Sequence, residues 1–348
     1  MKKRIYLDHN STTNISNTVK NEIFEVMNTF GNPSSIHLEG RKSRQLIERS
    51  REQIGNILDV DPENIIFTSS ATEAASMILK DKKNSCSLLE HSCVTEWCEN
   101  TLKVDLKGQI MIKEPMISVS HIGNSETGII QDEFKNVFLL DVVQAIGKIN
   151  FSFEKANVNS AIISAHKFGG PKGIGAALFK SDFDVQALIR GGGQERRLRS
   201  GTENILGIVG FAKALEISNK NIKNGYWEEI SEIKNFLENE ILNISNNSII
   251  VGKNLKRLPN TSCIITPGWD GHNQVIQLDL AGFSVSAGSA CSSGKMKYSN
   301  TLIALGYNKD LSKQAIRVSL GVNTKKSEVE AFLKEWSSLY YNWSKHVA

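Results

Sequence analysis

The chain has 348 residues, of which 40% are hydrophobic and 22% are charged. This length exceeds what one hydrophobic core usually supports, so we expect two domains, or one large domain with a smaller one. The formal net charge of +4 is small for this length, which gives no case for nucleic acid as a partner.

The N-terminal residues Met1-Lys2-Lys3-Arg4 imitate the basic start of a signal peptide, but only three apolar residues follow before Asp8. No run approaches the roughly eighteen apolar residues that a membrane-spanning helix needs, so we expect a soluble protein with no membrane partner. The five cysteines include no Cys-x-x-Cys pair, which argues against a disulfide framework or a zinc site. We therefore expect a cytoplasmic location.

The first elements predicted along the chain are two helices. Apolar residues recur at helical spacing from Val19 to Phe30, and Gly31-Asn32-Pro33 provides a stop, because glycine can cap a helix and proline cannot continue one. A second helix is predicted from Leu38 to Leu58.

Short, continuous apolar runs come next, and they predict the strands of a sheet. Because these runs do not alternate with polar residues, they favour strands covered on both faces in a mostly parallel α/β sheet. The predicted strands cover about 65–68, 86–89, 117–119, 137–140, 161–164 and 174–179, and a helix opens near Ala71.

A second domain is predicted after Ser218, where the composition becomes more charged. The stretch from Tyr226 to Leu242 predicts a connecting helix. Strands are then predicted at 248–251, 262–266 and 315–320, with helices near 272–280 and 329–343.

The residues Ser164-Ala165-His166-Lys167 place an amine at the end of a predicted buried strand, with glycines behind it. Burial lowers the pKa of an amine and frees its lone pair, which suits a covalent imine with a carbonyl cofactor. Pyridoxal phosphate is the cofactor that this arrangement favours. The alternative is an ordinary strand-end lysine that extends to solvent.

Three further segments could serve such a cofactor. Residues 68–73 lie where a strand turns into a helix, so backbone N–H groups and the Thr72 hydroxyl could hold a phosphate, although helix capping explains the same residues. Asp141 ends a strand and could keep a pyridine nitrogen protonated, with Gln144 donating to the ring oxygen, unless Asp141 is a loop carboxylate. His91 could lie flat on the cofactor ring, or it could be a hydrogen-bonded residue with a purely structural role.

Two residues further along suggest substrate chemistry. Cys291 is surrounded by small residues, whereas a packed thiol usually has apolar neighbours, so Cys291 could approach a substrate as a thiolate. Arg317 interrupts an apolar strand, and a buried arginine needs an anionic partner such as a substrate carboxylate.

Assembled in order, these motifs resemble those of the cysteine desulfurases, pyridoxal-phosphate enzymes of the class V aminotransferase group with fold type I. The resemblance runs nearly end to end. It rests on Tyr6-Leu7-Asp8, Gly31-Asn32-Pro33-Ser34-Ser35, Ala71-Thr72-Glu73, Asp141 with Gln144, Ser164 to Lys167, Arg199 to Asn204, Gly288-Ser289-Ala290-Cys291 and Arg317.

The resemblance implies an α/β fold with a large, mostly parallel sheet domain over residues 14–218. A smaller α+β domain, which carries the cysteine loop, would combine residues 1–13 with 219–348. It also implies a homodimer, in which Thr202 completes the phosphate site of the other subunit.

The resemblance further implies roles for individual residues. Lys167 would carry the cofactor imine, His91 would stack on the ring, and Cys291 would be the catalytic thiol. Arg317 and Asn32 would bind substrate. The other residues implied to bind the cofactor are Ala71, Thr72, Asn124, Asp141, Gln144, Ser164 and His166.

The sequence departs from the family pattern at two places that bear on the site and the sheet. Where two asparagines usually precede Glu-Thr-Gly, this chain has Asn124-Ser125, so the expected asparagine is displaced or replaced by Ser125. The region from Lys80 to Gln144 is also shorter than usual and lacks covering helices. We expect it to leave apolar surface that a partner covers or that weakens the lone protein.

The resemblance implies conversion of L-cysteine to L-alanine with a persulfide on Cys291. The sulfur would pass to an acceptor or scaffold protein for iron-sulfur clusters or thio-cofactors. One alternative is a selenocysteine lyase, or another lyase or aminotransferase that uses pyridoxal phosphate. The other is a catalytically weakened dimeric partner in cluster assembly.

Overall fold

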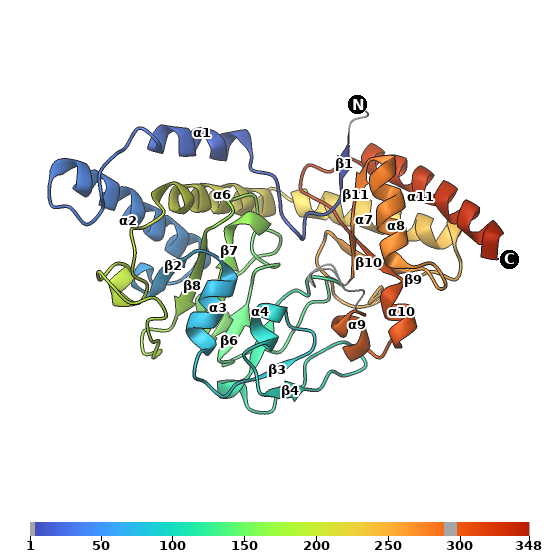
Figure 1. Ribbon diagram of the computed structural model, residues 1–348, viewed down its shortest axis with the longest axis horizontal. Helices are drawn as coiled ribbons and strands as arrows, with labels where there is room; N and C mark the ends of the chain where they lie inside the picture. The colour runs from blue at the N-terminus through green and yellow to red at the C-terminus, as the bar shows by residue number, and fades with distance from the viewer. Residues whose placement is uncertain (1–3, 289–297, 348) are drawn as a thin grey trace.

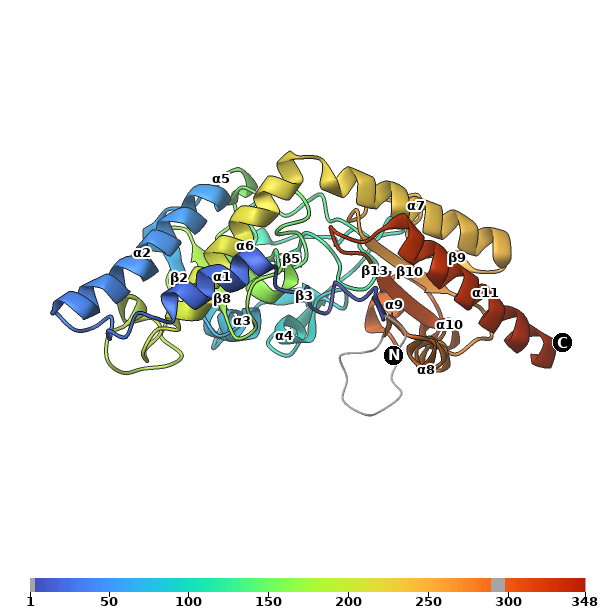
Figure 2. The same cartoon turned by 90° about the horizontal axis from the view of Figure 1, so that it is seen from above.

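The computed structural model describes residues 4–288 and 298–347. Its larger part surrounds strands β2, β8, β7 and β6, and its smaller part contains β9, β10, α8 and α11 (Figure 1). Helices α6 (Ile205–Lys223) and α7 (Tyr226–Ile244) follow one another across the molecule and join the two parts (Figure 2).

The central sheet of the larger part has the strand order β2-β8-β7-β6-β5. Strands β5, β6 and β7 pair in parallel, whereas β8 is antiparallel to both of its neighbours. A parallel pair of β3 and β4 lies beside β5 through a bridge between Ser85 and Ser118. The predicted mostly parallel sheet is confirmed. The bounds are β2 Ile65–Thr68, β3 Ser85–Ser87, β4 Asn100–Leu102, β5 Val119–His121, β6 Leu139–Asp141, β7 Ser160–Ser164 and β8 Gly175–Phe179.

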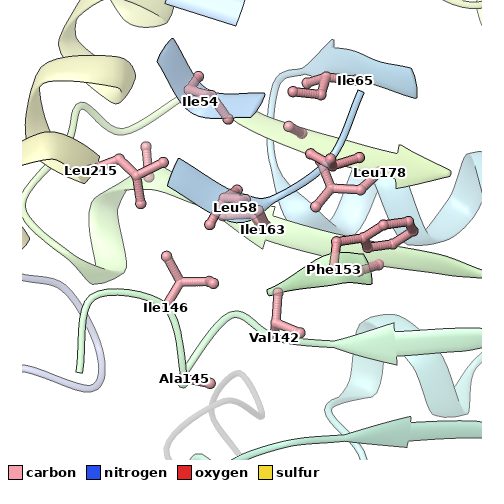
Figure 3. Close-up of a cluster of buried hydrophobic side chains, with 14 of the residues drawn as sticks. Ile54, Leu58, Ile65, Val142, Ala145, Ile146, Phe153, Ile163, Leu178 and Leu215 are labelled. Atoms are coloured by element: carbon pink, nitrogen blue, oxygen red, sulfur yellow. The ribbon is translucent and has the colours of Figure 1, made fainter. Parts of the chain in front are cut away.

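Both faces of this sheet are buried, as the continuous apolar runs predict. Successive strand residues point to opposite faces, so Ile65 joins one core cluster and Ile66 joins another. Helices α2 (Leu38–Leu58) and α6 cover the first face, where Leu58 and Leu215 pack near Ile163 (Figure 3). Helix α3 (Ala71–Leu79) covers the other face, and α1 (Asn17–Val26) packs on α6.

The smaller part has its own core, centred on Trp269 and Trp336. Its sheet has the order β12-β13-β10-β9, and β1 pairs in parallel with β11. Leu7, just after β1, belongs to this core. The bounds are β1 Ile5–Tyr6, β9 Ile249–Ile250, β10 Thr261–Ile265, β11 Phe283–Ser284, β12 Ser286–Ala287, β13 Ala315–Ser319, α8 Gly271–Ala281 and α11 Lys326–Val347.

Short helices complete the described chain, and none was predicted from the sequence. They are α4 Ser92–Thr95, α5 Phe153–Ala156, α9 Asn300–Ala304 and α10 Lys309–Lys313. Across residues 4–288 and 298–347, no helix is both long enough and apolar enough to cross a membrane.

Two predicted boundaries were wrong. Helix α1 ends at Val26 and not at Phe30, because Met27 and Phe30 are mainly exposed and gain no burial from continuing the helix. Strand β5 begins at Val119, two residues later than predicted, because Pro115–Ile117 forms a 3-10 turn. The other predicted strands agree with the structure within about two residues.

Candidate active site

One cavity of about 350 Å³ lies where strands β5, β6 and β7 end and the two parts of the molecule meet. This position matches the rule that α/β sheets bind ligands beyond the carboxyl ends of their strands. Its volume falls in the range of small-molecule sites. Ten residues predicted from the sequence line it: Ala71, Thr72, His91, Asn124, Asp141, Gln144, Ser164, His166, Lys167 and Arg317.

Lys167 lies at the end of a 3-10 turn, Ala165–Lys167, that follows β7. Its Nζ donates hydrogen bonds of 2.9 Å to the backbone carbonyls of Asn10 and Ser11. These carbonyls belong to the N-terminal segment, so the position of the amine depends on contact between the two parts of the chain. The amine is half-buried in the cavity and does not extend freely into solvent.

Asp141 ends β6, so the strand direction brings its carboxyl group into the cavity. Burial raises the pKa of this carboxyl group, and a 2.8 Å hydrogen bond from the Val143 N–H to Oδ1 partly opposes the shift. A carboxylate can accept several hydrogen bonds. A cationic ring nitrogen bound here would favour the charged form of Asp141.

Gln144 is held in one orientation by two neighbours. Its Nε2 donates to the carbonyl of Asn10 at 3.0 Å, and its Oε1 accepts from Nζ of Lys148 at 2.7 Å. Because a backbone carbonyl can only accept, the NH₂ group must face Asn10, and the amide oxygen then faces Lys148. A second N–H of Gln144 thus remains for a ligand oxygen.

Lys148 was not identified from the sequence, although it lies only four residues after Gln144. It is 3% exposed and also donates to Oδ1 of Asn10 at 3.2 Å. Burial, followed by the charges of Lys167 and Arg317, lowers its pKa well below the usual range.

The N-terminus of α3 forms another wall of the cavity. Ser70 caps this helix, and the backbone N–H groups of its first turn have no partners within the helix. His166 faces the same cavity, and its buried Nδ1 has no hydrogen-bond partner among the described residues. Burial, then the charges of Lys167 and Lys172, lowers the pKa of His166 to about 4.

His91 caps the short helix α4, and its Nδ1 accepts a 3.2 Å hydrogen bond from the Cys93 N–H. The neutral ring must then carry its proton on Nε2. The backbone thus fixes the tautomer and orientation of His91 within the cavity.

A buried pair of Glu90 and His121 was also missed from the sequence. His121 Nδ1 lies 2.7 Å from Glu90 Oε1, and His121 lines the cavity. Burial alone would lower the pKa of His121, but the charge and hydrogen bond of Glu90 raise it overall. No sequence signal connects these residues, because Glu90 lies in the loop after β3 and His121 ends β5.

Arg317 on β13 is buried, as expected, and its anionic partner within the chain is Asp8. Nη2 lies 2.7 Å from Asp8 Oδ1, and Nη1 donates to the carbonyl of Ser125 at 3.1 Å. Its Nε is buried without a hydrogen-bond partner among the described residues. The Nε–H of Arg317 is therefore among the donors left for a ligand anion while Asp8 holds the guanidinium in place.

Asn124 lines the cavity, but its side-chain oxygen is already used inside its own turn. Oδ1 accepts from the N–H groups of Glu126 and Thr127, and Nδ2 donates to the Leu89 carbonyl at 3.0 Å. Ser125, the replacement weighed from the sequence, also lines the cavity.

Two other predicted residues are not among those that line this cavity. Asn32 lies in the exposed connection between α1 and α2, and Thr202 is exposed in the loop before α6. The expected role of Asn32 in substrate binding and that of Thr202 in a partner's phosphate site stay predictions. Cys291 lies outside the described residues. On one side of it Ser286 lines the cavity, and on the other Ser299 donates to Glu126 at 2.5 Å.

Comparison with known proteins identifies the family. A profile described as "Aminotransferase class-V" matches residues 5–96 and 104–332. The chain belongs to the class V aminotransferase family. A "Cysteine desulfurase IscS" of Dictyoglomus turgidum is 33% identical over 370 residues, covering 94% of this chain and 92% of that protein. The alignment is longer than this chain, so the relative has residues with no counterpart here.

Other relatives agree. A "Putative cysteine desulfurase IscS 1" of Bacillus subtilis is 31% identical over 95% of this chain and 97% of its own. The X-ray structure of a NifS-like protein from Rickettsia africae is 32% identical, with a TM-score of 0.87 over 97% of this chain and 99% of that chain. The predicted pyridoxal-phosphate fold type I is confirmed.

Class V proteins of this kind depend on pyridoxal phosphate, and the cavity fits that group. The unpartnered Nδ1 of His166 and the open N–H groups of α3 suit a phosphate, while Asp141 suits a ring nitrogen. Gln144 has an N–H left for the ring oxygen. Lys167 places an amine in the same cavity for the carbonyl carbon.

Proposed function

We propose that this protein is a cysteine desulfurase, which converts L-cysteine to L-alanine and leaves the sulfur as a persulfide on Cys291. The observation that carries the proposal is the single cavity that gathers Lys167, Asp141, Gln144 and Arg317. The names of the matched relatives support the same reaction. The persulfide would then supply an acceptor or scaffold protein in the cytoplasm.

Each residue of the cavity has a task in this reaction. Asp141 holds the ring nitrogen of the cofactor, while α3, Ser164 and His166 hold its phosphate. Arg317 binds the substrate carboxylate through its free Nε, and its ion pair with Asp8 keeps the guanidinium in position. Pyridoxal phosphate, when bound, supplies an electron sink that stabilises negative charge beside the substrate amine.

Lys167 acts as the proton carrier. Its amine lies within the cavity and can move the proton of the substrate α-carbon once it is displaced from the cofactor. The carbonyls of Asn10 and Ser11 hold the amine at this place. His91, whose proton is fixed on Nε2, offers a second donor beside the ring.

Cys291 accepts the sulfur. Its thiolate attacks the substrate sulfur, the carbon–sulfur bond breaks, and the carbon takes up a proton to give alanine. One thiol becomes one persulfide, so atoms and electrons balance without an added oxidant. Ser286, which precedes the cysteine segment, lines the cavity, and this position supports the role.

The proposal includes a homodimer in which Thr202 and Asn32 act on the partner's site. Both residues are exposed and absent from the cavity of their own chain. Light scattering of the purified protein tests this part, and a monomer would contradict it.

One assay tests the activity itself. Purified protein loaded with pyridoxal phosphate is incubated with L-cysteine and a thiol reductant, and alanine and sulfide are quantified together. Equal amounts of the two products are expected. Pyruvate and ammonia in place of alanine would indicate a different lyase, and a preference for selenocysteine would assign the alternative substrate.

A further inference from the structure

A second hollow lies on the face of the large part that α2 and α6 cover, near the C-terminal ends of these helices. Its volume is about 990 Å³, and it is lined by the end of α2, the end of α6, helix α5, and residues before and after β6. We call it the connection groove. Apolar side chains dominate its floor, including Ile57, Phe134, Ile146, Ile149, Phe151 and Ile222.

The floor of the connection groove is continuous with the main core. Leu58, Ile146 and Leu215 line it, and they belong to the buried cluster drawn in Figure 3. Phe134 and Ile149 pack on the same cluster but remain only partly buried. The groove is therefore an edge of the core that the chain itself leaves uncovered.

The connection between β5 and β6 explains why this edge is uncovered. Parallel neighbours usually need a crossover of about a dozen residues or more, which is commonly a helix that covers the sheet. Here the fully described stretch 122–138 contains no helix, and it reaches β6 soon after Gln131. Relatives contain residues with no counterpart in this chain.

Charge distinguishes the rim of the groove from its floor. Four lysines line it, Lys135, Lys155, Lys223 and Lys256, against one carboxylate, Asp132. Asp132 pairs with Lys256 at 3.0 Å, whereas the other three lysines form no ion pair among the described residues. An apolar floor with a basic rim complements a helix that is apolar on one face and acidic on the other.

We propose that the connection groove binds an amphipathic helix of a partner protein whose polar face is acidic. The bound helix covers the core edge that a crossover helix would otherwise cover. Burial of its apolar face against Phe134, Ile149 and Phe151 supplies the affinity, and Lys135, Lys155 and Lys223 select the acidic face. The groove is separate from the cavity that contains Lys167, so this binding does not depend on the proposed activity.

A stapled, fluorescein-labelled helical peptide of about four turns is the probe. It carries leucines at helical spacing on one face and glutamates elsewhere, and a second peptide replaces the glutamates with lysines. Fluorescence anisotropy with the full-length protein should show binding of the acidic peptide only. The triple variant Lys135→Glu, Lys155→Glu, Lys223→Glu should weaken this binding at least about tenfold, which corresponds to about 1.4 kcal/mol.

Two further variants separate the groove from general effects. Lys334→Glu on α11 changes an exposed charge on the other part of the molecule and should leave binding unchanged. Phe134→Ala removes floor area and should weaken binding while circular dichroism confirms that the protein is folded. Absence of binding, equal binding of both peptides, or unchanged affinity of the triple variant would overturn the proposal. Assemblies larger than a dimer that disappear in Phe134→Ala would instead assign the groove to a second copy of this chain.

Discussion

Asp8 and Arg317 are 309 positions apart in the chain, yet their side chains form a 2.7 Å ion pair at the wall of the cavity. Both side chains are mostly buried, with 14% and 9% of their surface exposed. Asp8 Oδ2 also accepts a 2.8 Å hydrogen bond from Ser286, near the start of the cysteine segment. The pair therefore connects the N-terminal segment, the anion-binding residue and the segment that contains Cys291.

Arg317→Lys should raise the KM for L-cysteine at least about tenfold, because lysine cannot bind Asp8 and a substrate carboxylate through separate fixed donors. The absorbance of the bound cofactor should stay the same, since Arg317 is assigned to the substrate. Steady-state kinetics and a visible spectrum measure the two effects. An unchanged KM would remove Arg317 from substrate binding.

Lys167→Ala should abolish the covalent cofactor absorbance, because Lys167 places its amine among the cavity residues that fit pyridoxal phosphate. Lys172→Ala is the matched control, since Lys172 is nearby but exposed, and it should keep the colour. Borohydride reduction followed by peptide mapping locates the attachment directly. A label on Lys172 would disprove the assignment.

Cys291→Ala should separate the two halves of the chemistry. The variant should keep its colour and still change its spectrum with cysteine, because Lys167 and Asp141 are intact. Alanine production should fall to background, since no thiolate attacks the substrate sulfur. Cys263→Ala is the control, because Cys263 is buried and burial raises the pKa of its thiol above the usual range. Alanine and sulfide released at the parent's rate by Cys291→Ala would favour a direct lyase.

Glu195→Ala should destabilise the fold by about 3–5 kcal/mol, because it removes the buried carboxylate that pairs with Arg51 and leaves only the partly exposed Glu48 as its charge partner. Arg51 binds Glu195 through contacts of 2.6 and 2.9 Å, and the Phe67 N–H donates to the same carboxylate at 2.8 Å. Urea unfolding measures the loss. The double variant Arg51→Met, Glu195→Leu should be less destabilised than the single variant, and the opposite order would contradict the explanation.

His9 should make stability depend on pH. Burial, followed by the charge of Lys148, lowers its pKa from 6.5 to about 4. Between these values the unfolded chain takes up a proton that the folded chain resists, so stability falls as pH decreases from about 6.5 to about 4. His9→Gln lacks this loss. As pH decreases through this window, the unfolding free energy of the parent should therefore fall relative to that of the variant, by up to about 1.4 kcal/mol per pH unit. A difference independent of pH would contradict the assignment.

Much of the cavity was predictable because its residues follow strands. Asp141 and Lys167 end apolar runs, and parallel strands bring their carboxyl ends to one edge of a sheet. Lys148 and His121 were missed for a different reason. Their roles come from contacts with Asn10 and Glu90 that depend on tertiary structure and leave little pattern in the sequence.

The boundary errors have a similar cause. Phe30 continues the helical spacing of α1, but the fold offers it no surface to pack against, and 87% of it is exposed. Spacing predicts which residues could share a face. It does not predict whether another element covers that face.

Contacts between the N-terminal segment and residues far along the chain determine when the cavity can form during synthesis. Strand β1 pairs with β11, Asn10 contacts Gln144 and Lys148, and Asp8 binds Arg317, which is synthesised 309 positions later. Asp8 must therefore remain without this partner until Arg317 has been synthesised. Cofactor binding should accordingly be a late event, because contacts of such long sequence separation form slowly.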